Sequence, residues 1–431
     1  MGNEETQLIK NFLKTNYGIS DELMNVYDKT LNDIAPYLKR ADEIAEINTA
    51  KVLKAFSDNG VSEAHLGSTT GYGYDDLGRD TLDKIYADVF GAEDAIVRHN
   101  IVNGTMAIAA CLFGILRPGD TLVSATGRPY DTLEEVIGIT GEQGNGSLKD
   151  LGVSYKQVDL IDNKVDFETL GKVLKDPTVK AVELQRSKGY AWRDSFSVEY
   201  LGEVISFIKS INKDIVCIVD NCYGEFVSDK EPTQVGADLI VGSLIKNPGG
   251  GLAKSGGYIA GTKKCVELVS YRLTCPGIGR ECGATLDNNR SMYQGFFMAP
   301  HIVAQSIKAG IFCSGIFENL GFEVTPSYKD VRSDIITSVK LGSREKLIEF
   351  CKGIQKGSPI DSFVVPSPWA MPGYQDEVIM AAGAFVQGSS IEISADGPMR
   401  EPYVAYFQGG ITFESAKLPV LFAAQNVLDL M

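Results

Sequence analysis

The stretch Asp238-Leu-Ile-Val-Gly-Ser-Leu-Ile-Lys-Asn-Pro-Gly-Gly-Gly251 leads from an apolar run into a Ser-x-x-Lys turn and then a glycine-rich loop. Its apolar part predicts a buried strand, and Lys246 lies just beyond the end of that strand. Burial disfavours the ammonium form, so we expect Lys246 to lose its proton easily and to act as a nucleophile. A lysine is by itself usually a solvated residue, so the surrounding chain has to support this interpretation.

The composition is that of a globular protein long enough for two domains, with 431 residues, 44% of them hydrophobic and 23% charged. A formal net charge of −15 argues against nucleic acid as a partner. Eight cysteines are scattered singly, which indicates reduced thiols, and three separated histidines give little support to a metal site. The acidic start lacks a signal core and no uncharged apolar stretch of about 18 residues occurs, so we expect a cytoplasmic protein without a membrane span.

The hydrophobic pattern changes along the chain. Residues 1–60 carry apolar positions at helical spacing and predict an N-terminal helical arm. Residues 61–300 alternate short apolar runs with amphipathic segments, which predicts a largely parallel sheet covered by helices on both faces. Residues 301–431 mix strands and helices in a smaller α+β domain. The expected strands are Ala95–Val97, Thr121–Ser124, Val179–Leu184, Ile215–Val219, Leu239–Gly242, Gly257–Ala260, Ile335–Val339 and Ser390–Ser394.

Two further motifs follow strands of the predicted sheet, where ligands of open parallel sheets bind. Asn103-Gly104-Thr105 opens a helix, whose free N–H groups suit a phosphate, although a simple helix cap explains the same residues. Asp220 ends the strand before Lys246 and could hold a pyridine nitrogen protonated, or could be a turn residue. The 26 residues between Asp220 and Lys246 leave room for a helix and the next parallel strand. We therefore expect an acid and an amine to face one ligand.

Five blocks of the chain together carry a family resemblance. The sequence resembles the fold type I, pyridoxal-phosphate-dependent enzymes of the cystathionine/methionine gamma-lyase group, and within it the aluminium-resistance or methionine gamma-lyase-like branch. The resemblance implies an α/β, aspartate aminotransferase-like large domain with a mostly parallel, seven-stranded sheet and a smaller α+β C-terminal domain. The blocks are Gly71-Tyr-Gly-Tyr-Asp-Asp-Leu-Gly-Arg-Asp80, Gln185-Arg-Ser-Lys-Gly-Tyr190, Val219-Asp-Asn-Cys-Tyr-Gly-Glu225, Gly242-Ser-Leu-Ile-Lys-Asn-Pro-Gly-Gly-Gly251 and Gln387-Gly-Ser-Ser-Ile-Glu-Ile-Ser-Ala-Asp-Gly397.

The resemblance also implies roles for single residues. Lys246 would form the Schiff base with pyridoxal 5'-phosphate and Asp220 would pair with the ring nitrogen. Gly104, Thr105 and Ser243 would hold the phosphate, and Tyr130 would stack on the ring. Gln185 and Ser187 would contact the phenolic oxygen of the ring. Tyr72, Tyr74 and Arg79 would reach the phosphate of a neighbouring copy.

The glycine-rich loop and the substrate carboxylate site each allow two interpretations. Gly249-Gly-Gly-Leu-Ala-Lys-Ser255 looks like a phosphate-binding Walker loop, but Ala253 stands where that motif requires glycine. Lys254 in this loop is the rival of Lys246 for the Schiff base, and we prefer Lys246 because it ends the strand. The late block 404–410 lacks the arginine that grips the substrate carboxylate in the better-known lyases. Arg400 is the nearest substitute, with a surface ion pair as the alternative explanation.

The implied activity is that of a carbon–sulfur lyase, with Lys246 moving the Cα proton of methionine, cystathionine or a cysteine-like amino acid. Sulfur would leave from the β or γ carbon, giving a 2-oxo acid and ammonia. The same core residues support aldolase or aminotransferase chemistry on a small amino acid, and also a cofactor-binding stress-response protein with little turnover. The resemblance implies a homo-oligomer, a dimer with shared active sites assembled into a tetramer.

Overall fold

The computed structural model describes residues 3–431 and divides into two compact units. One unit comprises residues 44–301, and the other comprises residues up to 43 together with 302–431. The helical pattern expected near the N-terminus is formed by α1 (Asn3–Tyr17) and α2 (Asp21–Asp58). α2 supplies residues to both units.

The unit of residues 44–301 is built on a seven-stranded sheet with the order β1-β9-β8-β7-β6-β2-β3. Strands β3, β2, β6, β7 and β8 pair in parallel, whereas β9 pairs antiparallel with both β8 and β1. The strands are β1 (Asp94–Arg98), β2 (Thr121–Ser124), β3 (Ser154–Gln157), β6 (Val179–Gln185), β7 (Val216–Asp220), β8 (Leu239–Ser243) and β9 (Gly257–Gly261), with a separate hairpin of β4 (Leu160–Ile161) and β5 (Lys164–Val165). The expectation of a mostly parallel central sheet is thus confirmed.

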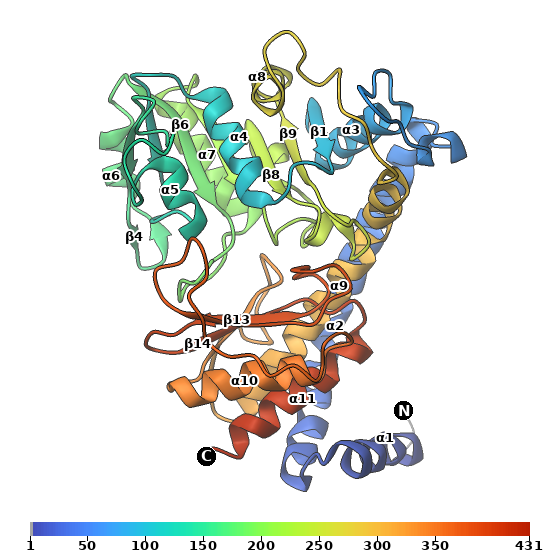
Figure 1. Cartoon of the computed structure of the whole chain (residues 1–431). Helices are drawn as coiled ribbons and strands as arrows, with labels where there is room; N and C mark the ends of the chain where they lie inside the picture. The colour runs from blue at the N-terminus through green and yellow to red at the C-terminus, as the bar shows by residue number, and fades with distance from the viewer. Residues whose placement is uncertain (1–2) are drawn as a thin grey trace. The chain divides into compact units, whose positions relative to one another are not determined.

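Helices cover both faces of this sheet (Figure 1). Alternate residues of each strand face opposite sides, so apolar side chains of one strand pack against helices on both faces. On β9, Ile259 packs into an apolar cluster with α4 (Gly104–Ile115) and α8 (Lys263–Leu273). The preceding residue, Tyr258, lies on the other face of the sheet, and its ring centroid is 5.2 Å from that of Phe90 in α3. The other helices of this unit are α3 (Leu77–Phe90), α5 (Glu134–Ile137), α6 (Phe167–Val173) and α7 (Val198–Ile211), and its 3-10 turns are η1 (Glu63–Leu66), η2 (Asp131–Leu133), η3 (Pro232–Val235) and η4 (Asn247–Gly249).

The register of the parallel strands brings their carboxyl ends to one edge. Gln185 at the end of β6 pairs with Asp220 at the end of β7, and Asp220 pairs with Val241 near the end of β8. These strands are almost wholly buried, which explains why their sequences are continuous apolar runs rather than alternating ones. The polar residues that follow them are therefore held by a rigid support.

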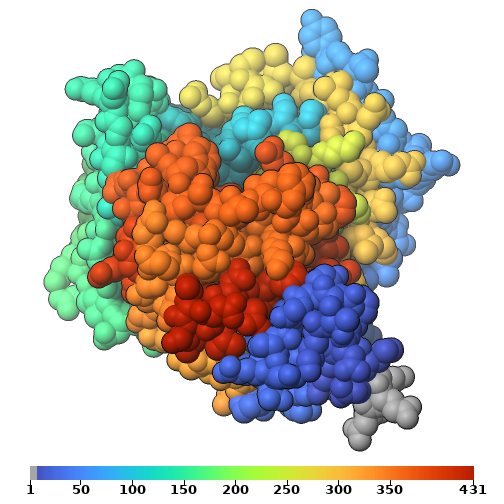
Figure 2. Space-filling model, turned by 60° about the horizontal axis from the view of Figure 1, so that its bottom comes forward, coloured from blue at the N-terminus to red at the C-terminus, as the bar shows by residue number. Residues whose placement is uncertain are grey.

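The second unit contains a five-stranded antiparallel sheet with the order β10-β11-β14-β13-β12. Helices α10 and α11 pack side by side against it, and α11 lies beside the N-terminal helices, where Gln425 Oε1 accepts from the Ser20 N–H at 3.0 Å (Figure 2). Its elements are β10 (Glu323–Thr325), β11 (Thr337–Lys340), β12 (Val378–Ala382), β13 (Ser394–Pro398), β14 (Val404–Gln408), α10 (Arg344–Lys356) and α11 (Phe413–Leu428). The long helix α9 (Asn289–Asn319) supplies residues to both units.

One expected strand was placed wrongly. Residues 390–393 lie in buried turns, and β13 begins only at Ser394. The reason is Glu392, whose buried carboxylate accepts from the backbone N–H groups of Phe385 and Val386 at 2.7 and 2.8 Å. These bonds to a loop stabilise a turn in a stretch that alternates apolar and polar residues like a strand.

By length and composition alone, α9 is the one helix among residues 3–431 that could cross a membrane. Its apolar window is 72% buried inside the protein, which is typical of a core helix. Gly315 contributes to this packing, because a methyl group there would meet Thr30 and Ile34 of α2. All eight cysteines lie in the described part of the chain and none forms a disulfide.

Central strand β7 provides a test of the core. Ile218 is fully buried in the apolar cluster, so Ile218→Ala should lower the free energy of unfolding by about 3 kcal/mol, through lost burial and a cavity. The measurement is urea denaturation followed by circular dichroism. The matched control Ile161→Ala removes the same atoms from a residue that is 59% exposed in the β4–β5 hairpin, and it should change stability by less than about 0.5 kcal/mol. Equal effects of the two variants would contradict the assigned core.

Candidate active site

Lys246 lies three residues beyond β8, where the chain turns into η4. Its side chain is half-buried and its Nζ lies 4.0 Å from the ring centroid of Tyr223. Lys254, the rival lysine, is exposed. The amine that sits among buried polar groups is therefore that of Lys246.

Asp220 is the nearest acid on the neighbouring strand. It ends β7, and its Oδ1 accepts from the Cys222 N–H at 3.1 Å. Burial raises the pKa of the Asp220 carboxyl, and the charge of Lys246 acts in the opposite direction. The two residues thus stabilise each other's charged forms, as expected for an acid and an amine at adjacent strand ends.

The charge of Lys246 differs from the sequence expectation. Burial acts to lower the pKa of Lys246, but Cys222, Tyr223, Asp220 and Glu225 act in the opposite direction when they are ionised, and the pKa is raised above its ordinary value. These surroundings favour the ammonium form of Lys246 over the neutral amine. The expectation of an easily deprotonated lysine was wrong because it counted desolvation and left out the acids of the 220–225 segment.

The start of α4 forms a tight recess beside the end of β8. Asn103 caps the helix by accepting from the Met106 N–H at 2.8 Å. A methyl group on Gly104 would come within 3.1 Å of Cys222 Sγ and 3.8 Å of Ser243 Cβ, so these residues surround the helix terminus. Thr105 turns its hydroxyl to Thr132 at 2.7 Å. The recess presents free backbone N–H groups and suits an anion.

Gln185, Ser187 and Tyr130 gather where β6 ends. Gln185 Nε2 donates to the Ser187 carbonyl at 3.1 Å, while Gln185 Oε1 is buried without a hydrogen-bond partner. A methyl group on Gly189 would lie 3.0 Å from Gln185 Nε2 and 3.4 Å from the ring of Tyr130, which places that ring beside the amide. An unpaired buried carbonyl costs stability unless a ligand satisfies it.

The 71–80 block divides into an exposed part and a buried part. Tyr72 and Tyr74 are 73% and 58% exposed and stack at 5.6 Å. Arg79 is buried, and its guanidinium donates to the carbonyls of Gly73 and Gly283 and pairs with Asp80. In this structure Arg79 therefore braces the loop of its own chain, whereas Tyr72 and Tyr74 are presented outward.

Arg400 lies in the unit that includes residues 302–431. Its guanidinium donates to Asp376 Oδ2 at 2.9 Å, and both side chains are substantially exposed. The ion pair that we considered as the alternative explanation is thus formed.

Tyr223 and Glu225 both contact or influence Lys246, and sequence reasoning gave neither of them a role. Tyr223 holds a left-handed backbone conformation, with φ 72°, and its ring lies under the Lys246 ammonium. Glu225 is fully buried and is among the groups that raise the pKa of Lys246. Both stand in the block Val219–Glu225, so their closeness to Asp220 in the sequence was the available signal.

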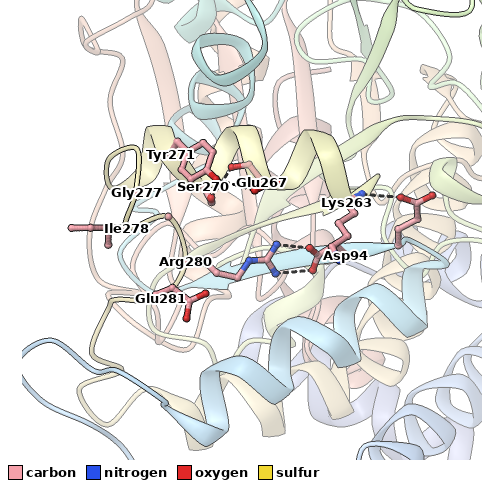
Figure 3. A pocket seen from close by; sticks show the side chains of 11 residues that line it. Asp94, Lys263, Glu267, Ser270, Tyr271, Gly277, Ile278, Arg280 and Glu281 are labelled. Carbon is pink, nitrogen blue, oxygen red and sulfur yellow. Dashed lines mark hydrogen bonds and ion pairs between the residues drawn. The ribbon is translucent and has the colours of Figure 1, made fainter.

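A separate hollow of about 550 Å³ lies beside α8 (Figure 3). Its charged side chains are largely satisfied within the protein, since Arg280 pairs with Asp94 and the Tyr271 hydroxyl donates to Glu267 at 2.9 Å. It shares no residue with the groups around Lys246. The hollow therefore does not mark the site of chemistry.

Comparison with known proteins places this site in context. A family model described as methionine gamma-lyase matches residues 23–428. An uncharacterized protein of Bacillus subtilis, YnbB, is 53% identical over 398 residues, which are 92% of this chain and 94% of that protein.

Solved structures extend the similarity to the whole fold. A carbon–sulfur lyase involved in aluminum resistance from Clostridium novyi has a TM-score of 0.93, with 55% identity over 99% of each chain. A candidate cystathionine beta-lyase involved in aluminum resistance from Clostridium acetobutylicum has a TM-score of 0.95, with 51% identity over 97% of this chain and 99% of that one. A pyridoxal-5'-phosphate-dependent protein from Escherichia coli, YhfS, shares the fold at a TM-score of 0.61 and 16% identity, covering 91% and 97% of the two chains.

The brace formed by Arg79 can be tested directly. Arg79→Met removes the donors of two loop carbonyls and should lower the free energy of unfolding by about 2 to 3 kcal/mol, because buried acceptors lose their partners. The loop at 68–77 should also become sensitive to limited proteolysis. Lys84→Met, on an exposed position of the same helix, is the matched control and should change neither property. A stable, protease-resistant Arg79→Met variant would contradict this role.

Proposed function

This chain belongs to the methionine gamma-lyase family and is a pyridoxal-phosphate-dependent carbon–sulfur lyase, and we propose that Lys246 carries the cofactor. The observation that supports this most directly is the pairing of a buried acid and a lysine at the ends of two adjacent parallel strands, Asp220 on β7 and Lys246 after β8. The proposal includes the fold type I layout, in which such strand ends form the cofactor site.

The residues around Lys246 fit the cofactor chemically. The start of α4 at Gly104 offers free backbone N–H groups beside Ser243, which suits a phosphate group. The unpaired Gln185 Oε1 and the nearby Tyr130 ring offer a polar contact and an aromatic surface for a planar ring. Gly104, Thr105 and Ser243 would hold the phosphate, with Gln185 and Ser187 toward the phenolic oxygen.

When bound, the cofactor supplies an electron sink for the pair of electrons left when the substrate Cα–H bond breaks. Asp220 would hold the ring nitrogen in its charged form, since a buried carboxylate strongly favours a cationic partner. So paired, Asp220 would no longer act on Lys246 as an uncompensated charge, which would ease loss of the ammonium proton. Lys246 Nζ can then take the Cα proton as a base and return it as an acid.

The substrate is proposed to be a sulfur-containing amino acid of the methionine, cystathionine or cysteine type. Support comes from the methionine gamma-lyase model and from the relatives described as carbon–sulfur or cystathionine beta-lyases. Loss of a thiol from the β or γ carbon would leave a 2-oxo acid and ammonia. Arg400 stays a candidate for the substrate carboxylate, in which case it would have to exchange its partner Asp376.

The oligomeric state and the cellular location are also part of the proposed function. The exposed pair Tyr72 and Tyr74 has the surface position needed to reach the phosphate of a second copy, so we propose a homodimer with shared sites, doubled into a tetramer. The eight free cysteines support a reducing, cytoplasmic location.

The first test is the identity of the lysine. Purified protein mixed with pyridoxal phosphate should turn yellow and should bear the cofactor on Lys246 after borohydride reduction and peptide mass spectrometry. Lys246→Ala should abolish the reducible adduct, whereas the matched variant Lys254→Ala should keep it, because Lys254 is exposed. An adduct retained by Lys246→Ala would refute the assignment.

The second test is the reaction. The loaded protein should release a 2-oxo acid and a thiol in equal amounts from at least one of methionine, cystathionine and cysteine. Lys246→Ala serves as the inactive control. Conversion of an amino acid without thiol release would favour an aldolase or aminotransferase, and cofactor binding without turnover would favour a stress-response binding protein.

A further inference from the structure

A buried carboxyl, Glu225, lies behind the Lys246 site and has no role in the chemistry described so far. Its side chain is fully buried. The Tyr258 hydroxyl donates to Glu225 Oε1 at 2.9 Å, while Glu225 Oε2 has no hydrogen-bond partner among the described residues. A buried carboxylate with one oxygen left without a partner is poorly stabilised, so this geometry favours the protonated acid.

Glu225 is fixed against the strand that leads to Lys246. A methyl group on Gly242 of β8 would collide with Glu225 Oε1 and with the ring of Tyr258, so the absence of a side chain at 242 makes room for the acid. The backbone carbonyl of Glu225 accepts from Asn247 Nδ2 at 3.0 Å, and Asn247 directly follows Lys246. The acid and the lysine therefore cannot move far apart.

The buried charges around Glu225 do not balance if it is ionised. Arg186 is the guanidinium of this cluster, and its Nη1 lies 3.4 Å from Glu231 Oε2 and 2.7 Å from Asn221 Oδ1. Asn221 Nδ2 donates to Glu231 Oε2 at 2.9 Å and to the Tyr258 hydroxyl at 3.3 Å. Arg186 thus compensates Glu231, and Lys246 is the cation that acts on Glu225.

Titratable groups from several elements surround Glu225. They are Asp220, Cys222 and Tyr223 on its own segment, Tyr258 on β9, Tyr86 on α3, Glu231 at the start of η3 and Lys246 after β8. Burial raises the pKa of Glu225 to about 8 and Glu231 acts in the same direction, while the backbone N–H of Glu225 itself, the Tyr258 hydrogen bond and Lys246 oppose this shift. Glu225 is thus mainly protonated at neutral pH.

We propose that Glu225 is a positioning residue that retains its proton and so limits the negative charge around the Lys246 amine. This inference rests on the proposed function of Lys246. Asp220 has to stay ionised to hold a ring cation, and a second carboxylate would keep Lys246 as an ammonium that cannot accept the Cα proton. The proton remains on Glu225 throughout, and the Cα proton moves only to Lys246 Nζ and back.

The first arm of the test uses cofactor-free protein. A carboxyl whose folded-state pKa is raised loses stability as the pH climbs from its unfolded value, near 4.5, to its folded value, near 8. Relative to Glu225→Gln, the unfolding constant of the unmodified protein should therefore rise by about tenfold per pH unit in this range. Urea denaturation between pH 5.5 and 9 measures it. A difference between the two proteins that does not vary with pH overturns the proposal.

The second arm uses loaded protein and follows the visible band of the bound cofactor as a function of pH. A protonated Glu225 carries no charge, so the neutral Glu225→Gln should leave the midpoint of the spectral change within a few tenths of a pH unit of that of the unmodified protein. A midpoint moved to lower pH by about one unit would show that Glu225 is ionised beside Lys246, and it overturns the positioning role. If the unmodified protein binds no cofactor, the proposed function fails and the role at Lys246 fails with it. The first arm still decides whether Glu225 keeps its proton.

A pair of tyrosines gives matched controls. Tyr258 donates to Glu225, whereas the buried hydroxyl of Tyr86 has no hydrogen-bond partner among the described residues. Tyr258→Phe removes a bond that favours the charged carboxylate, so the pH-dependent loss of stability should move to higher pH. Tyr86→Phe should leave its position unchanged. Should Glu225→Gln fail to fold, this pair decides the question, and identical pH profiles of the two variants overturn the proposal.

Discussion

The mutual stabilisation of Asp220 and Lys246 is the interaction on which the site depends. Each residue is costly where it stands, because burial opposes the charge of both. Together they are tolerated, since each charge is the other's nearby counterion. The parallel pairing of β7 and β8 supplies the geometry, and the buried apolar strands keep it rigid. A bound ring that carries a cation would change this balance and free the lysine for proton transfer.

The acids around Lys246 also favour its ammonium form. A lysine held as an ammonium is a poor nucleophile, so the cofactor and its charge become part of how the site is activated. Asp220 acts on Lys246 directly, and Arg186, Asn221, Glu231 and Tyr258 form a buried hydrogen-bonded network beside Glu225. A buried network of this kind is energetically demanding, because every unsatisfied group within it destabilises the fold.

Two glycines near Lys246 allow other groups to come close to the backbone. Gly104 lets the start of α4 come close to Cys222 and Ser243, and Gly242 leaves the space that Glu225 and Tyr258 occupy. In both places a side chain would displace a functional group. The glycines in these two blocks are thus explained by close approach, not by a need for an unusual backbone angle.

Much of the site could be read from the residues themselves. Lys246, Asp220 and the Gly104-Thr105 helix start each follow a strand whose apolar run announces a buried parallel strand, and such strands end at one edge of the sheet. The strand expected at 390–394 was misplaced because a local pattern of alternating residues does not reveal that Glu392 binds the backbone of a loop. The sequence likewise could not show that Arg79 is buried against Gly73 and Gly283, that acids outweigh desolvation at Lys246, or that Tyr258 meets Glu225. Each of these depends on residues far apart along the chain or on the sum of several charges, and only the tertiary structure brings them together.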